Sequence, residues 1–128
     1  MLDKIKIWFW ITLAVLALGF VGWYFGKPTP TNLDGFAQCL SAKNATMYGA
    51  YWCSHCQAEK ARFGDAFRFV NYVECTVETK KCLDNKIDGY PTWILGDGTR
   101  LSGEQGLDGM SRATGCLLPD ENGQYKNQ

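Results

Sequence analysis

The chain has 128 residues, a length that suits one domain of modest size. Its 13 Lys and Arg residues balance its 13 Asp and Glu residues, and this zero net charge argues against a nucleic-acid partner. Six cysteines are dense for so short a chain, and they indicate metal binding or catalysis in a reducing compartment and disulfides outside one.

The first predicted element is a transmembrane signal-anchor helix at residues 7–25. This segment carries no charge and has aromatic side chains at both ends, and as a helix it would be about 28 Å long. A cleaved signal peptide is the alternative, but the apolar run is long and no small-x-small cleavage site follows it. Lys4 and Lys6 lie within residues 1–6 and favour a cytoplasmic N-terminus. We therefore expect a single-pass membrane protein with its domain on the extracytoplasmic side, periplasmic or lumenal.

Residues 26–34 contain two prolines and are predicted to be a Pro/Thr linker, and Asp34 is expected to cap the helix that follows. The later elements are expected in the order helix 35–43, strand 46–52, helix 57–69, strand 69–75, a short helix within 76–87, strand 93–95, strand 99–102 and helix 107–116. Asp97-Gly98 favours a primed hairpin turn, and the polar residues 118–128 are predicted to be a flexible tail. Parallel strands joined by helices, followed by a hairpin, predict an α/β fold with a mixed sheet covered on both faces.

Cys53 and Cys56 form a Cys-x-x-Cys motif where a predicted strand meets a predicted helix. The first turn of a helix has unpaired N–H groups and a partial positive charge, which favour a thiolate at Cys53. Cys56 lies three residues on and can attack a mixed disulfide formed by Cys53. His55 is the only histidine, and as a cation or donor near Cys53 it would stabilise the reduced form and make the disulfide a stronger oxidant.

Three alternatives to a redox-active dithiol remain open. In a zinc site, Cys75 and Cys82 would supply the other ligands, although their spacing is wide for a zinc knuckle. A chaperone could bind copper or zinc through the dithiol, with Met47 and Met110 as poorly placed additional ligands. A purely structural domain would need an inert, buried dithiol.

The motif and its surroundings resemble those of thioredoxin-fold proteins. Trp52 precedes the dithiol as in the Trp-Cys-x-x-Cys of that family, and Tyr90-Pro91-Thr92 lies where the family carries its cis-proline loop. The resemblance covers about residues 35–117. It implies a thioredoxin-like domain with a cis peptide before Pro91, and it places Tyr90, Pro91 and Trp52 at the substrate-binding surface, with Trp52 shielding the dithiol.

The resemblance also bears on the remaining residues. Met47 stands where thioredoxin has a buried carboxylate, and Glu59 is a weakly supported substitute as the proton acceptor for Cys56. Six cysteines allow fifteen connectivities. The terminal helices of a thioredoxin fold pack near each other, which implies a Cys39–Cys116 bridge. Cys75 and Cys82 would then form either a structural bridge, which we favour, or a second redox pair.

A narrower resemblance is to the thioredoxin-like domain fused to bacterial and plant homologues of vitamin K epoxide reductase. It is carried by residues 47–53, 74–75, 82 and 89–93. In those proteins the domain passes electrons from substrate thiols to a membrane quinone reductase, and the four-helix membrane enzyme itself has no counterpart in this chain.

We therefore predict a membrane-anchored thiol–disulfide oxidoreductase that needs no cofactor. Its expected partners are cysteine-containing protein substrates and a quinone-linked membrane oxidoreductase, such as a vitamin K epoxide reductase homologue, that re-oxidises it. The favoured direction is oxidation of substrate thiols, and a reductase or isomerase of the same fold is the alternative.

Overall fold

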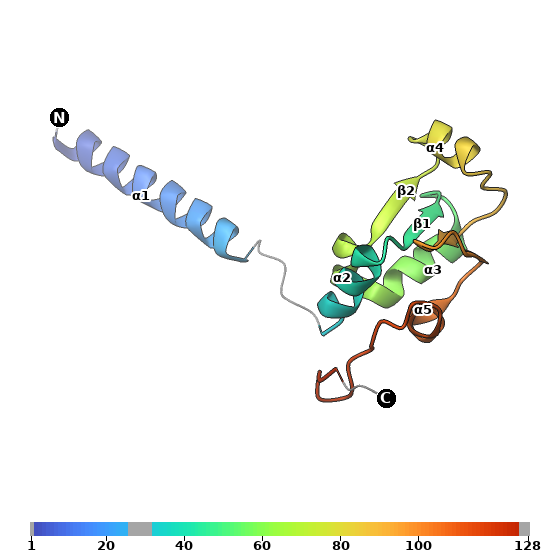
Figure 1. Cartoon of the computed structure of the whole chain (residues 1–128). Coiled ribbons are helices and arrows are strands. Elements are labelled where there is room, and N and C mark those ends of the chain that lie inside the picture. The colour runs from blue at the N-terminus through green and yellow to red at the C-terminus, as the bar shows by residue number, and fades with distance from the viewer. Residues whose placement is uncertain (1, 26–31, 126–128) are drawn as a thin grey trace.

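The computed structural model describes residues 2–25 and 32–125. Helix α1 (Leu2–Phe25) lies apart from the domain formed by the rest of the chain (Figure 1). Most of the predicted linker, residues 26–31, lies outside the described residues.

The prediction of a transmembrane helix at residues 7–25 is wrong. Within the part of the chain that the structure describes, no helix is both long and apolar enough to cross a membrane. Lys4 and Lys6 lie in the first turns of α1.

The domain is built on a four-stranded mixed sheet, as the sequence predicts. Its strands are β1 (Thr46–Gly49), β2 (Asn71–Glu74), β3 (Thr92–Ile94) and β4 (Arg100–Ser102), in the spatial order β2-β1-β3-β4. β1 and β2 are parallel, whereas β3 runs antiparallel to both β1 and β4. This arrangement of strands and helices fits a thioredoxin-like fold.

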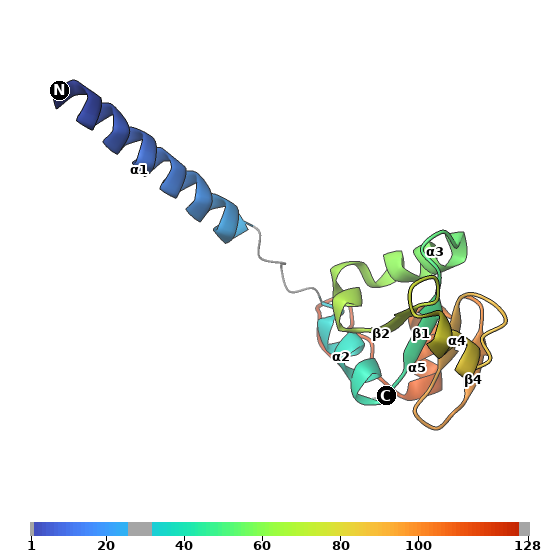
Figure 2. The ribbon, with the colours of Figure 1, turned by 90° about the horizontal axis from the view of Figure 1, so that it is seen from above.

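The helices cover the two faces of the sheet unequally. They are α2 (Asp34–Ala42), α3 (Ser54–Phe63), the 3₁₀ helix η1 (Gly64–Phe69), α4 (Thr79–Asp84) and α5 (Gly106–Thr114). The register pair Met47 and Trp93 faces a main core supplied by α2, α3 and α5. The alternate pair Tyr48 and Val73 faces a smaller cluster closed by α4, which lies at the carboxyl end of β2, away from α2 (Figures 1 and 2).

Two local boundaries differ from the sequence prediction because of tertiary contacts and backbone geometry. The expected helix 57–69 is two helices, since Gly64 adopts a φ of 53° and ends α3. Asp34 is the first residue of α2 rather than its cap, and its carboxylate accepts a hydrogen bond of 2.6 Å from Arg68 Nη2 in η1. That bond ties the start of α2 to η1.

The hairpin turn and the C-terminal segment also differ in detail. The β3–β4 loop has five residues, 95–99, and among them only Gly98 has a positive φ, of 87°, so the turn is not of the primed type. Residues 119–125 fold back on themselves through a bridge between Pro119 and Tyr125. The Tyr125 hydroxyl donates to the backbone oxygen of Asn32 at 2.7 Å. This segment therefore contacts the beginning of the domain, which its polar sequence did not predict.

Candidate active site

The dithiol lies at the start of α3, one short turn after β1. Cys53 is the N-cap of α3, with extended backbone angles, and its N–H donates to the backbone oxygen of Ala50 at 3.1 Å. Its sulfur accepts a hydrogen bond of 3.4 Å from the backbone N–H of Cys56. Cys53 thus occupies the position where a side-chain anion is stabilised by a free helix N–H and by the helix dipole. Both sulfurs are free thiols in the structure.

The two thiols differ in their environments. Cys53 is 7% exposed, whereas Cys56 is completely buried behind it. Burial, followed by a hydrogen bond with Cys53, raises the pKa of Cys56 from 9.0 to about 11, although the charge of Lys60 acts in the opposite direction. The Cys56 thiol therefore carries its proton near neutral pH, and Cys53 is the sulfur that a substrate can reach.

The Tyr90–Pro91 peptide is cis, as the resemblance implies. The Cys53 sulfur lies 3.8 Å from the backbone oxygen of Tyr90, so the loop lies directly beside the outer thiol. Pro91 is buried, and its backbone oxygen accepts from the N–H of Gly103 at 2.8 Å, which ties the loop to the end of β4. The loop is thus fixed against both the dithiol and the sheet.

Exposed aromatic side chains surround this junction. Trp52 is 62% exposed and Tyr51 is 68% exposed. The Trp52 ring packs edge-to-face on Tyr90, with ring centroids 6.0 Å apart. Trp52 therefore projects beside the cis-proline loop with most of its surface in solvent. Together with Tyr90 it offers an apolar rim next to Cys53.

His55 lies on the outer surface of α3 and contacts an acidic side chain. Its Nδ1 is 2.6 Å from Oε1 of Glu104, and the histidine side chain is 69% exposed. Glu104 also accepts from Arg62 Nη1 at 2.7 Å. These hydrogen bonds, that of His55 first, hold the pKa of Glu104 below its ordinary value. His55 thus lies between the two cysteines in the sequence, but in the structure its ring contacts Glu104.

Glu59 is a buried carboxylate that anchors the start of α5. It is fully buried and accepts from Arg62 at 2.8 Å, from the Trp93 indole at 3.2 Å and from the backbone N–H groups of Gln105 and Gly106. These donors account for both of its oxygens. Glu59 therefore joins α3, β3 and α5, and the groups that donate to it among the described residues do not include Cys56.

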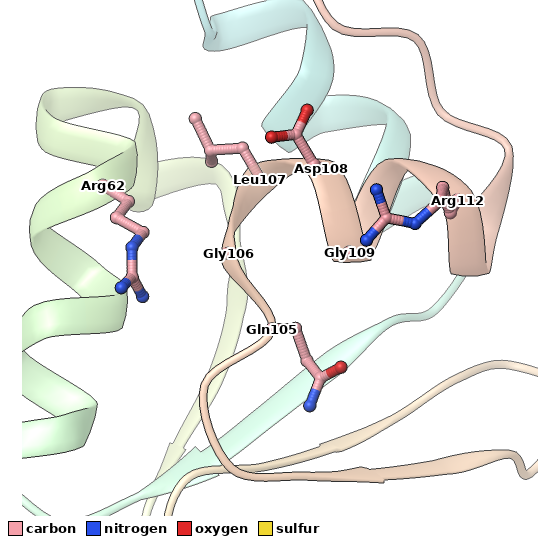
Figure 3. Close-up of a pocket in the computed structure, with 7 residues that line it drawn as sticks. All are labelled: Arg62, Gln105, Gly106, Leu107, Asp108, Gly109 and Arg112. Carbon is pink, nitrogen blue, oxygen red and sulfur yellow. The ribbon is translucent and has the colours of Figure 1, made fainter.

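An open pocket of about 540 Å³ lies beside this junction, between α3 and the beginning of α5 (Figure 3). Its lining comes from one residue of α3 and from the chain around the start of α5: Arg62, Gln105, Gly106, Leu107, Asp108, Gly109 and Arg112. The sequence analysis did not predict this pocket.

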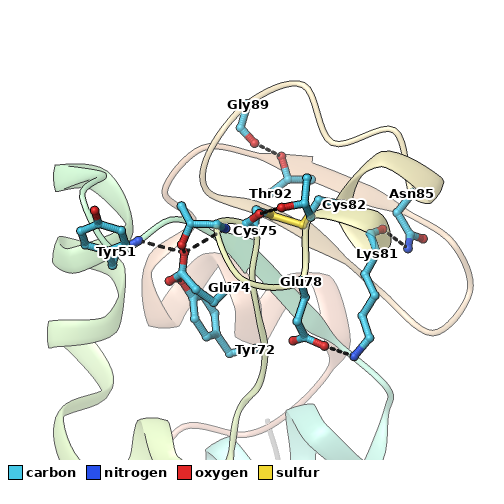
Figure 4. Close-up of a disulfide and its surroundings, with 12 residues drawn as sticks. Tyr51, Tyr72, Glu74, Cys75, Glu78, Lys81, Cys82, Asn85, Gly89 and Thr92 are labelled. Atoms are coloured by element: carbon cyan, nitrogen blue, oxygen red, sulfur yellow. Dashed lines mark hydrogen bonds and ion pairs between the residues drawn. A yellow bond between two sulfur atoms is a disulfide. The ribbon is translucent and has the colours of Figure 1, made fainter.

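The structure contains two disulfides with the predicted pairing. Cys39 of α2 is bonded to Cys116, just after α5, and Cys75 is bonded to Cys82 of α4 (Figure 4). The second bridge removes Cys75 and Cys82 as ligands for the zinc site considered above. Met47 and Met110 are fully buried in the core. Among the described residues, no group of three or more His, Cys, Asp or Glu side chains is placed to hold a metal.

Glu74, next to the Cys75–Cys82 bridge, holds the turn that precedes the dithiol. Its carboxylate accepts from the backbone N–H of Tyr51 at 3.1 Å, from the Tyr72 hydroxyl at 2.7 Å and from the Thr76 hydroxyl at 2.8 Å (Figure 4). Burial alone raises the pKa of Glu74, but these hydrogen bonds outweigh it and the pKa is lowered. The folded protein therefore stabilises the ionised form of the Glu74 carboxylate.

Replacing Glu74 by glutamine is expected to reduce the free energy of unfolding by about 1 kcal/mol at pH 7, since charge-assisted hydrogen bonds are lost at a partly solvated site. Because folding lowers the pKa of Glu74, this advantage of the wild type is complete above the ordinary value of 4.5 and disappears as the pH falls through the lower folded value. Urea unfolding of the wild type and of Glu74→Gln between pH 7 and 3 measures this difference in the free energy of unfolding. A difference that is constant with pH would contradict the assignment.

Sequence reasoning missed four residues near the site: Lys60, Tyr72, Glu74 and Glu104. Tyr72 and Glu74 are two residues apart in β2, so the period of a strand predicts that they share one face of the sheet. Lys60 is one helical turn after Cys56, so the period of a helix predicts that these two side chains share one face of α3. Their partners could not, since His55 and Glu104 are 49 residues apart and Tyr51 and Glu74 are 23 apart.

The chain is similar in sequence to a known thiol–disulfide oxidoreductase. No protein-family model matches the chain. Over 95 residues, 67% of the chain, it is 43% identical to the thiol-disulfide oxidoreductase LTO1 of Arabidopsis thaliana. The matched region spans 25% of the length of that relative. This similarity supports the prediction that the chain is an oxidoreductase of the thiol–disulfide type.

Proposed function

We propose that this domain exchanges the Cys53–Cys56 dithiol and disulfide with the cysteines of protein substrates. The observation that carries the proposal is the position of Cys53: it caps α3, accepts the N–H of Cys56 and lies 3.8 Å from the backbone oxygen of Tyr90 in the cis-proline loop. A helix N-cap stabilises a thiolate, which is the reactive form in disulfide exchange.

The reaction follows from the different burial of the two sulfurs. A substrate thiolate attacks the Cys53 sulfur of the oxidised protein, and the Cys53–Cys56 bond breaks with its electron pair on Cys56. A second substrate thiolate then attacks the substrate sulfur of the mixed disulfide, and Cys53 leaves as a thiolate. The substrate gains a disulfide, and the protein gains two thiols. Trp52, Tyr90 and Pro91 form the surface on which the substrate segment lies.

The favoured direction is oxidation of the substrate. Four of the six cysteines are joined in two disulfides, which supports an oxidising compartment for the domain. A quinone-linked oxidoreductase of the vitamin K epoxide reductase type is the partner proposed to re-oxidise Cys53 and Cys56, and the narrower sequence resemblance supports it.

Equilibration with glutathione tests the direction. The Cys53–Cys56 couple is expected to have a reduction potential above about −270 mV, the value typical of thioredoxin. The oxidised protein should also introduce a disulfide into a dithiol peptide. A potential at or below that value, with no peptide oxidation, would favour the reductase alternative.

His55 is proposed to raise this potential by stabilising the reduced dithiol. Replacing His55 by alanine is expected to lower the potential by about 30 mV, which corresponds to a tenfold change in the equilibrium with glutathione. Glu104→Gln is the matched control, because it removes the acidic partner of His55 and leaves the imidazole in place. A potential that is unchanged in His55→Ala would assign His55 to the surface ion pair alone.

A further inference from the structure

The buried sulfur of Cys56 lies against Gly49 and Tyr72. A methyl group added to Gly49 would lie 2.9 Å from the Cys56 sulfur, 3.2 Å from Tyr72 Cε2 and 3.3 Å from the Tyr72 hydroxyl. The absence of a side chain at Gly49 therefore lets the Tyr72 ring approach the sulfur from the sheet side, while α3 encloses it from the other side.

The same ring holds a cation. Lys60 Nζ lies 3.5 Å from the centroid of the Tyr72 ring and 5.4 Å from that of Phe67. Lys60 is four residues after Cys56 on α3, so both side chains lie on one face of the helix. A cation over an aromatic face is attracted by the ring quadrupole, which holds the ammonium group in place.

The ring is held in turn by an acidic residue. The Tyr72 hydroxyl donates to Glu74 Oε2 at 2.7 Å, and Oε1 of the same carboxylate accepts from the backbone N–H of Tyr51. The titratable groups that face Cys56 are thus Cys53 and Lys60 from α3 and Tyr72 from β2, with Glu74 behind Tyr72. Of these four groups, Lys60 is the cation.

We propose that Lys60, held over the ring of Tyr72, stabilises the negative charge that the Cys56 sulfur carries whenever the Cys53–Cys56 disulfide opens or closes. Tyr72 and Glu74 are positioning residues that hold Lys60. This inference rests on the proposed function. The charge of Lys60 also opposes the effect of burial on the pKa of Cys56.

The chemical step is balanced within the protein and its substrate. During closing, the Cys56 thiol gives its proton to water, and the thiolate attacks the Cys53 sulfur of the mixed disulfide. The Cys53–Cys56 bond forms as the bond between Cys53 and the substrate breaks. The electron pair leaves on the substrate thiolate, which takes up a proton from water. Opening is the reverse, with Cys56 as the leaving thiolate, so the same cation assists both directions.

The closing step can be timed with the aromatic disulfide DTNB. The reduced full-length chain releases one thionitrobenzoate when Cys53 reacts and a second when Cys56 closes the disulfide, in a first-order phase. Lys60→Met and Lys60→Gln are both expected to slow the second phase about threefold to tenfold, since a loss of thiolate is partly offset by higher nucleophilicity. Lys60→Arg should keep the rate near that of the wild type.

A second readout separates an electrostatic role from a structural one. Cys56 is protonated in the reduced protein at pH 7, so removing the charge of Lys60 should change the rate but leave the glutathione equilibrium at pH 7 unchanged. Lys80→Met, on the exposed surface of α4, is the matched control and should alter neither quantity. A second phase of wild-type rate in Lys60→Met, or equal slowing in Lys60→Arg, would overturn the inference. A wild-type chain with no second phase would instead refute the proposed function.

Discussion

Replacing Cys53 by serine is expected to abolish thiol–disulfide exchange, with a loss on the order of a thousandfold or more in peptide oxidation. The reason is that Cys53 is the sulfur at the helix cap, beside the cis-proline loop, whereas Cys56 is completely buried. A serine hydroxyl is far less acidic than a thiol and forms no disulfide. Dithiol-peptide oxidation, followed by mass spectrometry, measures the effect.

Cys56→Ser is the matched control, and its expected result is different. Cys53 should still react with a disulfide substrate, but the mixed disulfide should persist because no second thiol lies behind it. Mass spectrometry of the trapped adduct distinguishes the two variants. Both are expected to fold, since the structure holds these two cysteines as free thiols that form no cross-link. A stable adduct on Cys53→Ser and none on Cys56→Ser would reverse the assigned roles.

Removing the Cys39–Cys116 bridge by a double alanine substitution is expected to lower the free energy of unfolding by about 4–5 kcal/mol. The bridge joins α2 to the end of α5 across a sequence separation of 77 residues. In the chain-entropy model, a cross-link that closes so long a loop removes many conformations from the unfolded chain. Such a loss is a large part of the stability of a domain of this size.

The Cys75–Cys82 bridge provides the internal comparison. It closes a separation of only 7 residues, so its removal by double alanine substitution is expected to cost about 2.5 kcal/mol. Urea unfolding of both double variants against the wild type measures the two losses. Equal losses, or a larger loss from the shorter bridge, would show that loop length does not determine their contributions. In that case, packing of the sulfurs in the core would be the determining factor.

The dithiol and its position could be predicted from the sequence because they depend on local pattern. An aromatic, uncharged segment, a Cys-x-x-Cys and a segment with helical spacing follow one another in the sequence, and the structure places Cys53 at the N-cap of α3, one short turn after β1. The cis peptide before Pro91 and the disulfide pairing followed from resemblance to a known fold. The transmembrane helix was predicted from the length of an uncharged segment and the aromatic residues at its two ends, and the structure contradicts it.

The sequence by itself determined which groups we propose to carry the chemistry, since Cys53 and Cys56 are neighbours on one helical turn. The tertiary structure alone decided what surrounds them. Cys56 lies against Tyr72, and Glu74 holds the turn at Tyr51, only because β1 and β2 are adjacent and parallel. Such contacts depend on how distant segments pack, and packing is set by the whole core rather than by the residues on either side of a motif.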